Sequence, residues 1–276
     1  MDRIRLIASD MDATLLDEQS QLPADFEETI HALAALGIRF APASGRPLYT
    51  LEAMFPTLQD ELVFIGDNGG AIRWHGQDLF TSEMSPEGWR ALNRLTREQG
   101  DIAVLCGLES AYVERPFAVH DAVLRHFYTK IEYVDRLEDV TAPADKFTIY
   151  LPQHNAQQAY DTVYASQRSI YSVAVAGECW VDIMNPGVHK GAALQTLGQL
   201  WGLPSESIMA FGDTYNDAEM LRTAKYGFLM ENGSVPLRRN VPFLAPSNRE
   251  AGVMQILHRV LAQNGCVCPE DFIPAH

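Results

Sequence analysis

Basic residues are scarce in this sequence. Its 276 residues include 21 Lys and Arg against 36 Asp and Glu, which gives a formal net charge of −15 at neutral pH. Because so acidic a chain repels a phosphate backbone, we expect no nucleic-acid partner. Long hydrophobic runs are also missing: none approaches the roughly 18 residues of a membrane helix, and no signal peptide precedes the first apolar run. We therefore expect no membrane partner, and a cytoplasmic protein that is a monomer or a homodimer.

Several familiar motifs are absent as well. The four cysteines are scattered, and the closest pair, Cys266 and Cys268, is separated by one residue rather than the two typical of zinc and redox motifs. There is no G-x-S-x-G motif of a serine hydrolase and no H-E-x-x-H motif of a metalloprotease. Residues 67–70 (Asp-Asn-Gly-Gly) match neither common nucleotide-binding pattern, and we predict that they form a turn that opens a hairpin.

What is present is a regular alternation of short apolar runs and amphipathic stretches. Near the N-terminus it predicts strands at 4–9, 38–43 and 62–65, with helices at 23–36 and 47–55 between them. The alternation returns towards the C-terminus, with predicted helices at 188–201, 217–223 and 249–262 and strands at 208–211, 226–230 and 242–244. Such an order forms a parallel sheet covered on both faces. The predicted fold class is α/β, with a doubly wound, Rossmann-like parallel-sheet core.

The middle of the chain follows a different pattern. It predicts helices at 86–99, 118–128 and 155–165, and short strands at 102–106, 111–113, 147–151, 169–175 and 180–184. We interpret residues 84–184 as an α+β domain inserted into the α/β domain, which then consists of residues 1–83 and 185–276.

Polar side chains stand where the predicted core strands end. In an open parallel sheet the carboxyl ends of the strands form the ligand-binding edge. The residues that the topology brings to this edge are Asp10 and Asp12, Ser44, and the trio Asp213, Asn216 and Asp217. Each has a simple structural explanation by itself, as a helix cap, a turn former or a charge at a helix start. Those explanations do not account for the gathering of all of them at one edge.

Several carboxylates in one crevice repel each other, and a hard divalent cation is the usual remedy. Mg²⁺ fits this need because it binds one or two carboxylates together with phosphate oxygens. Lys190, near the start of a predicted helix, adds a positive charge, and Thr14 and Ser44 add hydroxyl donors. The sequence thus predicts a Mg²⁺ site that receives a small phosphorylated metabolite.

These segments resemble the four ordered motifs of the haloacid dehalogenase-like (HAD) phosphatases, and the insert after the second motif resembles the Cof-like branch, which carries a large cap domain. The resemblance covers essentially the whole chain. The motifs are Asp10-Met11-Asp12-Ala13-Thr14-Leu15-Leu16, Ser44-Gly45-Arg46, Lys190-Gly191 and Gly212-Asp213-Thr214-Tyr215-Asn216-Asp217.

The resemblance implies a role for each motif residue. Asp10 would be the nucleophile that forms an aspartyl-phosphate, and Asp12 would protonate the leaving alcohol and then activate water. Lys190 would neutralise charge as the third catalytic residue. Asp10, the Asp12 backbone carbonyl, Asp213 and Asp217 would hold Mg²⁺. Phosphate contacts would come from Thr14, Ser44, Gly45 and Asn216.

The inserted domain would close over the site and select the leaving group. Near its return hinge, Asn185 is our choice for a substrate contact. Sugar phosphates are the expected substrates, followed by phosphorylated cofactors such as pyridoxal phosphate or flavin mononucleotide.

Two alternatives stay open at this point. One is a phosphomutase, which returns the phosphoryl group to substrate rather than to water. The other is a catalytically silent protein that binds phosphorylated metabolites. Ala13 supports the second alternative, because the family usually has glycine there and a Cβ disfavours positive φ.

Overall fold

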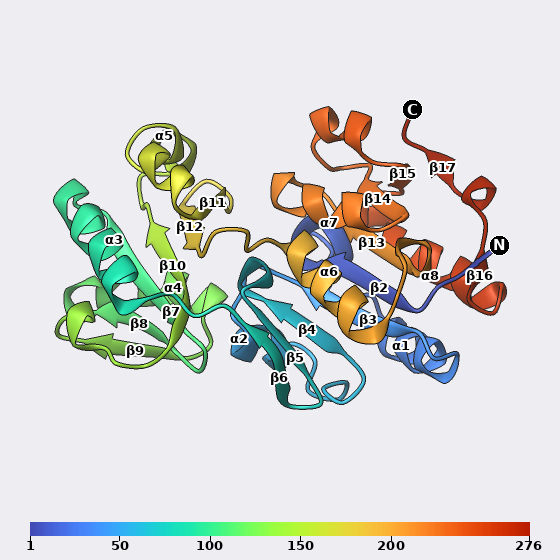
Figure 1. The fold of residues 1–276 in the computed structure, drawn as a ribbon, viewed down its shortest axis with the longest axis horizontal. Coiled ribbons are helices and arrows are strands. Elements are labelled where there is room, and N and C mark those ends of the chain that lie inside the picture. The colour runs from blue at the N-terminus through green and yellow to red at the C-terminus, as the bar shows by residue number, and fades with distance from the viewer.

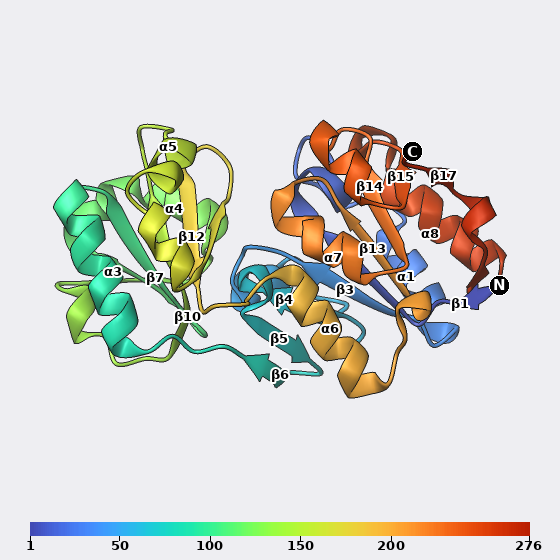
Figure 2. The ribbon, with the colours of Figure 1, turned by 45° about the horizontal axis from the view of Figure 1, so that its top comes forward.

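The computed structural model describes residues 1–276 and contains two main β-sheets, each with its own helices (Figure 1). The sheets lie in two lobes joined by two connecting segments, and both chain termini lie on the larger lobe, away from the smaller one (Figures 1 and 2). No helix has the length and the apolar character needed to cross a membrane.

The larger lobe is built on a nine-stranded sheet. Its strands, in spatial order, are β17 (Ile273–Pro274), β15 (Phe243–Ala245), β14 (Tyr226–Met230), β13 (Ile208–Gly212), β2 (Leu6–Asp10), β3 (Arg39–Ala43), β4 (Val63–Gly66), β5 (Ala71–Trp74) and β6 (Gln77–Thr81). The six from β15 to β4 run parallel, whereas β5, β6 and β17 are antiparallel to their neighbours. A separate pair, β1 (Asp2–Arg3) and β16 (Cys266–Val267), ties the two ends of the chain together.

Helices cover both faces of this sheet, as side-chain alternation along the strands requires. In β2, Ile7 packs with α1 (Phe26–Ala35), α2 (Leu48–Ala53) and α8 (Gly252–Ala262), whereas Leu6 and Ala8 pack with α6 (Lys190–Trp201) and α7 (Ala218–Thr223). The predicted α/β class with a Rossmann-like core is confirmed.

The smaller lobe has a six-stranded sheet of different character. Its order is β11 (Ser172–Val175), β12 (Trp180–Met184), β10 (Ala144–Tyr150), β7 (Ile102–Gly107), β8 (Ala111–Glu114) and β9 (Ile131–Val134), and every neighbouring pair is antiparallel except β8 and β9. One face packs on α3 (Pro86–Gln99) and α5 (Ala156–Asp161), and α4 (Asp121–Phe127) packs on the other.

The chain enters and leaves the smaller lobe between β6 and α3 and between β12 and α6. The domain boundaries that we predict, 83/84 and 184/185, lie within these two connections and remain our proposal for the division into domains. We refer below to residues 84–184 as the cap.

Some predicted elements are wrong in extent. The predicted helix 118–128 is a 3₁₀ segment, Arg115–His120, followed by the shorter α4, because Pro116 favours the start of a new turn. The predicted helix 155–165 ends at Asp161, and the predicted strand 169–175 begins only at Ser172. Residues 67–70 do form the turn that opens the β4–β5 hairpin, as predicted.

Candidate active site

The first motif follows the end of β2 and turns sharply. Asp10 is the last residue of the strand and is buried, whereas the side chain of Asp12 is 52% exposed. The turn requires Ala13 to adopt φ 62° and ψ 8°, a left-handed conformation that glycine adopts more easily. The carbonyl of Ala13 accepts a 2.8 Å hydrogen bond from the Asn232 side chain, which fixes the turn. The alanine therefore fits the loop at the expense of backbone strain.

Lys190 connects the first motif to the last. It is the first residue of α6, is fully buried, and its ammonium donates to Asp10 and, at 2.7 Å, to Asp217. Burial lowers the pKa of Lys190, but Asp10 and Asp217 outweigh that effect and the net shift is upward, so the ammonium stays charged. Gly191 allows this helix to start here, because a Cβ at that position would lie 2.6 Å from the Glu219 backbone.

Asp217 orients the loop that carries Asp213. One of its oxygens accepts the Lys190 bond, and the other accepts the backbone N–H groups of Asp213 and Thr214, at 3.0 and 3.2 Å. Gly212 makes room for this arrangement, since a Cβ there would meet the Asp217 side chain. The Asp217 carboxylate is thus held by three donors before any ligand is considered.

Asp10, Asp213 and Asp217 form one acidic group whose ligand atoms all lie within 4.8 Å of one another. Burial, followed by the charge of Asp217, raises the pKa of Asp213 to about 7. Burial also raises the pKa of Asp10 well above its ordinary value, with Lys190 opposing and the two other carboxylates reinforcing the shift. With only one ammonium among three carboxylates, the donor set fits a hard divalent cation bound through oxygen.

Ser44 and Gly45 follow β3 on the same edge of the sheet. Ser44 is 2% exposed, and its hydroxyl oxygen accepts a 3.1 Å hydrogen bond from the backbone N–H of Arg46. Both Ser44 and Gly45 line the large cavity described below. This loop therefore presents a hydroxyl group to the same cavity as Asp10 and Asp213.

Of the other two predicted phosphate contacts, one lies on the cavity wall and the other does not. Asn216 lines the cavity, and its side chain bonds Thr214 and, at 3.4 Å, Asn68. The Thr14 hydroxyl instead donates to Asp213 at 3.4 Å, and Thr14 does not line the cavity.

Asn185 does not line the cavity either, and its contact with substrate stays a prediction. Its side-chain amide donates to the Ser82 hydroxyl and to the Ser82 and Glu83 carbonyls, at 3.1, 3.2 and 2.8 Å. Since Ser82 and Glu83 belong to the other connection between the lobes, Asn185 ties the two connections together.

A cavity of about 1220 Å³ lies between the two lobes and contains most of these residues. Its cap side is formed by one face of β10 and β12, where alternation along each strand presents Lys146, Thr148, Asp182 and Met184 while Phe147 and Ile183 pack in the cap core. The aromatic side chains of Phe127, Tyr128 and Trp180 also line the cap side, together with residues of α5 and β11. The acidic group at the core therefore opens into a large, mixed polar and aromatic chamber.

Our sequence analysis assigned no role to several residues that the structure brings into this cavity. Arg46 stands within a recognised motif, and Asn68 within residues 67–70, which we predicted only to turn the chain. Lys146, Thr148 and Asp182 are polar residues in the largely apolar strands β10 and β12, but Asp145 is a polar residue of β10 too and does not line the cavity, so polarity alone does not identify them.

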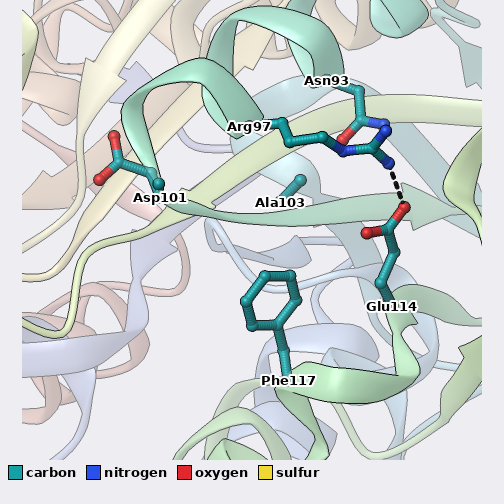
Figure 3. A pocket seen from close by; sticks show the side chains of 7 residues that line it. Asn93, Arg97, Asp101, Ala103, Glu114 and Phe117 are labelled. Carbon is teal, nitrogen blue, oxygen red and sulfur yellow. Dashed lines mark hydrogen bonds and ion pairs between the residues drawn. The ribbon is translucent and has the colours of Figure 1, made fainter.

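A second, much smaller hollow of about 70 Å³ lies within the cap (Figure 3). Its wall includes Arg97 and Glu114, whose side chains form a 2.6 Å ion pair. It shares no lining residue with the large cavity. It is therefore no part of the candidate active site.

The fold and the site together define a class, the α/β proteins with an acidic group at the carboxyl ends of parallel strands and a second lobe inserted into the chain. Residues 7–257 match the family model of the haloacid dehalogenase-like hydrolases. The chain belongs to this family.

Relatives in the family are phosphatases. The chain is 33% identical over 262 residues to the 5-amino-6-(5-phospho-D-ribitylamino)uracil phosphatase YbjI of Escherichia coli, covering 94% of this chain and 96% of that protein. It is 31% identical over 249 residues to the HMP-PP phosphatase of Cronobacter sakazakii, covering 87% and 89%. The crystal structure of SMU.1108c from Streptococcus mutans superposes with a TM-score of 0.86 at 28% identity, covering 94% and 99%. The chain is thus an enzyme of the phosphatase class, acting on phosphorylated small molecules.

Proposed function

We propose that this protein is a Mg²⁺-dependent phosphatase that hydrolyses small phosphorylated metabolites through an aspartyl-phosphate on Asp10. The observation that carries the proposal is the position of Lys190, whose buried ammonium joins Asp10 to Asp217 at the edge of the acidic group. An aspartate held by a fixed cation and opened to a large cavity suits attack on a phosphorus atom.

The first half of the reaction transfers the phosphoryl group to the enzyme. A carboxylate oxygen of Asp10 forms a bond to phosphorus as the bond to the leaving oxygen breaks, and Asp12 gives its proton to that oxygen. Lys190 and the Ser44 hydroxyl stabilise the negative charge of the phosphoryl oxygens. Asp10, the Asp12 carbonyl and Asp213, with Asp217 in support, would hold Mg²⁺, which when bound would offset the negative charge of the carboxylates and of the phosphoryl group.

The second half returns the enzyme to its starting state. Asp12, now ionised, takes a proton from water, and the resulting oxygen attacks phosphorus and breaks its bond to Asp10. Inorganic phosphate leaves and Asp12 is again protonated. The half-exposed position of Asp12, next to the cavity, supports its exchange of protons with both an alcohol and water.

The cap wall supports a polar leaving group that carries a ring. The Thr148 hydroxyl donates to Asp182 at 2.6 Å, and this polar pair lies on the cavity wall. Phe127 and Trp180 provide aromatic faces there, with ring centroids 5.0 Å apart. Sugar phosphates remain among the proposed substrates. The named substrates of the two relatives, a phosphoribitylaminouracil and HMP-PP, are the first compounds to compare with them.

A phosphate-release screen tests this function. Purified protein is incubated with sugar phosphates, 5-amino-6-(5-phospho-D-ribitylamino)uracil, HMP-PP, pyridoxal phosphate and flavin mononucleotide, with Mg²⁺ or with excess EDTA. We expect stoichiometric release of phosphate that requires Mg²⁺. Transfer of the phosphoryl group within the substrate, without release, would instead identify a phosphomutase, and no turnover of any compound would identify a silent binding protein.

We also propose that the reaction takes place in the cytoplasm. All four cysteines are free in the structure, as expected in a reducing compartment. The proposal of a monomer or homodimer is tested by light scattering of the purified protein.

A further inference from the structure

A second cluster of charged side chains, separate from the acidic group, lies where the cap meets the larger lobe. It consists of one lysine and three carboxylates, all at most 3% exposed: Lys146, Asp67, Asp145 and Asp182. The ammonium of Lys146 lies 3.0 Å from Asp67 and 3.5 Å from Asp182, and it donates a hydrogen bond to the carbonyl of Gly45. Lys146 and Asp182 come from the cap, whereas Asp67 and Gly45 come from the larger lobe.

The surroundings of Lys146 keep its ammonium charged. Burial alone lowers the pKa of Lys146, but Asp182 and Asp67 raise it well above its ordinary value. The ammonium donates a hydrogen bond to the Gly45 carbonyl, and the carboxylates of Asp67 and Asp182 lie within ion-pair distance of it. Lys146 thus joins the two lobes, although it also lies on the cavity wall.

The Gly45 carbonyl has a direct geometric connection to Ser44. It belongs to the same planar peptide group as the N–H of Arg46, so fixing the carbonyl also fixes the direction of that N–H. The N–H donates to the Ser44 hydroxyl oxygen at 3.1 Å. Because the oxygen is occupied as an acceptor, the hydroxyl proton is left to donate to another acceptor in the cavity.

We propose that Lys146 is a positioning residue through which closure of the cap orients the Ser44 hydroxyl towards the phosphoryl group. In the closed arrangement its ammonium holds the Gly45 carbonyl, and the Gly45–Arg46 peptide group passes this constraint to Ser44. The inference rests on the proposed function, in which Ser44 binds the phosphoryl group. It requires that replacing Lys146 weaken the binding of every phosphate ligand, whatever its leaving group.

A double-mutant cycle between Lys146 and Ser44 tests this inference. The variants Lys146→Met, Ser44→Ala and the double variant are compared by kcat/KM for p-nitrophenyl phosphate with Mg²⁺, and by the Kd of inorganic phosphate from calorimetry. Each single variant should weaken both quantities about tenfold, as expected for one hydrogen bond to a charged group. In the Ser44→Ala background, Lys146→Met should cost less than about twofold more. If the fold-changes caused by Lys146→Met and Ser44→Ala instead multiply in the double variant, the two residues act independently and the proposal is overturned.

Controls separate positioning from folding and from loss of charge. Arg94→Met removes an exposed cap cation and should change neither quantity. If Lys146→Met does not fold, as judged by its melting temperature, the cycle uses Lys146→Arg, whose rigid planar fork does not match the surroundings of the Lys146 ammonium. The Arg variant should show a smaller effect that again disappears with Ser44→Ala, and multiplication of the effects would again overturn the proposal.

The two readouts distinguish this inference from the proposed function. A non-additive cycle in phosphate binding without turnover of any substrate would refute the phosphatase activity and leave the positioning role standing. Normal turnover with an additive cycle would refute the positioning role alone. Absence of both turnover and phosphate binding would refute both.

Discussion

The guanidinium of Arg46 lies 2.8 Å from the carboxylate of Asp12 and holds that side chain in place, although it is half exposed. The same guanidinium donates to the His126 carbonyl at 3.4 Å and lies 5.6 Å from the centre of the Phe127 ring. His126 and Phe127 belong to α4 of the cap. Arg46 thus connects Asp12, the proposed general acid and base, to the cap, so that Asp12 is held in place when the cap is closed.

Replacing Arg46 with methionine should lower kcat/KM for phosphomonoesters about tenfold, because one charge-assisted hydrogen bond to Asp12 and the cap contacts are lost. Steady-state kinetics measure the effect. Arg115→Met is the matched control, since Arg115 is an exposed cap residue paired only with Asp135, and it should leave the kinetics unchanged. Equal kinetics for Arg46→Met and the wild type would contradict a role for Arg46 in holding Asp12.

Replacing Ala13 with glycine should stabilise the protein, or at least not destabilise it. Alanine at φ 62° stores about 1 kcal/mol of backbone strain, which exceeds or balances the entropy lost by ordering a glycine. Ala34→Gly in α1 is the control and should lower the free energy of unfolding by about 1 kcal/mol, because its backbone is helical. Urea unfolding measures both. A loss of about 1 kcal/mol in Ala13→Gly as well would show that the turn is not strained.

Replacing Asp145 with asparagine should change how stability depends on pH. Burial, followed by the charge of Asp67, raises the pKa of Asp145 well above its ordinary value of 3.8, and neither side-chain oxygen has a hydrogen-bond partner. The folded protein therefore holds a proton that the unfolded chain releases. This proton contributes its full stabilisation below the pKa of Asp145 in the unfolded chain. The stabilisation is lost as the pH rises through the pKa of Asp145 in the folded protein.

Asp145→Asn keeps the side chain neutral at every pH. Relative to the wild type, its melting temperature should fall less between pH 5 and pH 9, and it should be the more stable protein at the alkaline end. Asp139→Asn, at an exposed cap position, should follow the wild-type curve. Parallel curves for Asp145→Asn and the wild type would mean that Asp145 is ionised in the folded protein throughout.

Mg²⁺ should raise the melting temperature, because a ligand that binds only the native state stabilises it by about 2.7 kcal/mol at 100 times its Kd. Asp213→Asn should remove this shift, whereas Asp60→Asn, at an exposed position, should retain it. Potassium chloride at matched ionic strength controls for screening of the net charge of −15. A Mg²⁺-dependent shift that survives in Asp213→Asn would remove this carboxylate from the metal site.

Much of the fold could be predicted from the sequence because long elements follow their hydrophobic period. The predicted helix at 86–99 and the predicted strand at 226–230 match α3 and β14 residue for residue. Several short strands were missed: β5, β6, β9 and β17 have four, five, four and two residues, and they depend on their pairing partners rather than on their own pattern.

The residues at the strand ends were predictable for a similar reason. Asp10, Ser44 and Asp213 come to one edge because parallel topology brings the strand ends together. Lys146 and Asp182 could not be assigned to the cavity in the same way, since the sequence does not tell which face of the cap sheet turns towards the larger lobe. Asn185 was chosen for its place near the hinge, and the structure shows that its amide is used within the hinge itself.

The central claim is that the phosphoryl group passes through Asp10, and direct detection of the phosphorylated residue tests it most sharply. Asp12→Asn protein is mixed with p-nitrophenyl phosphate and Mg²⁺, quenched in acid and digested, and the peptide that contains Asp10 is analysed by mass spectrometry. We predict a phosphoryl group on Asp10, because this variant lacks the base for the second half of the reaction, and none in Asp10→Asn, which should be folded but inactive. Substantial phosphate release by Asp10→Asn, or turnover by the wild type with no phosphorylated Asp10 in the Asp12→Asn protein, would contradict the account.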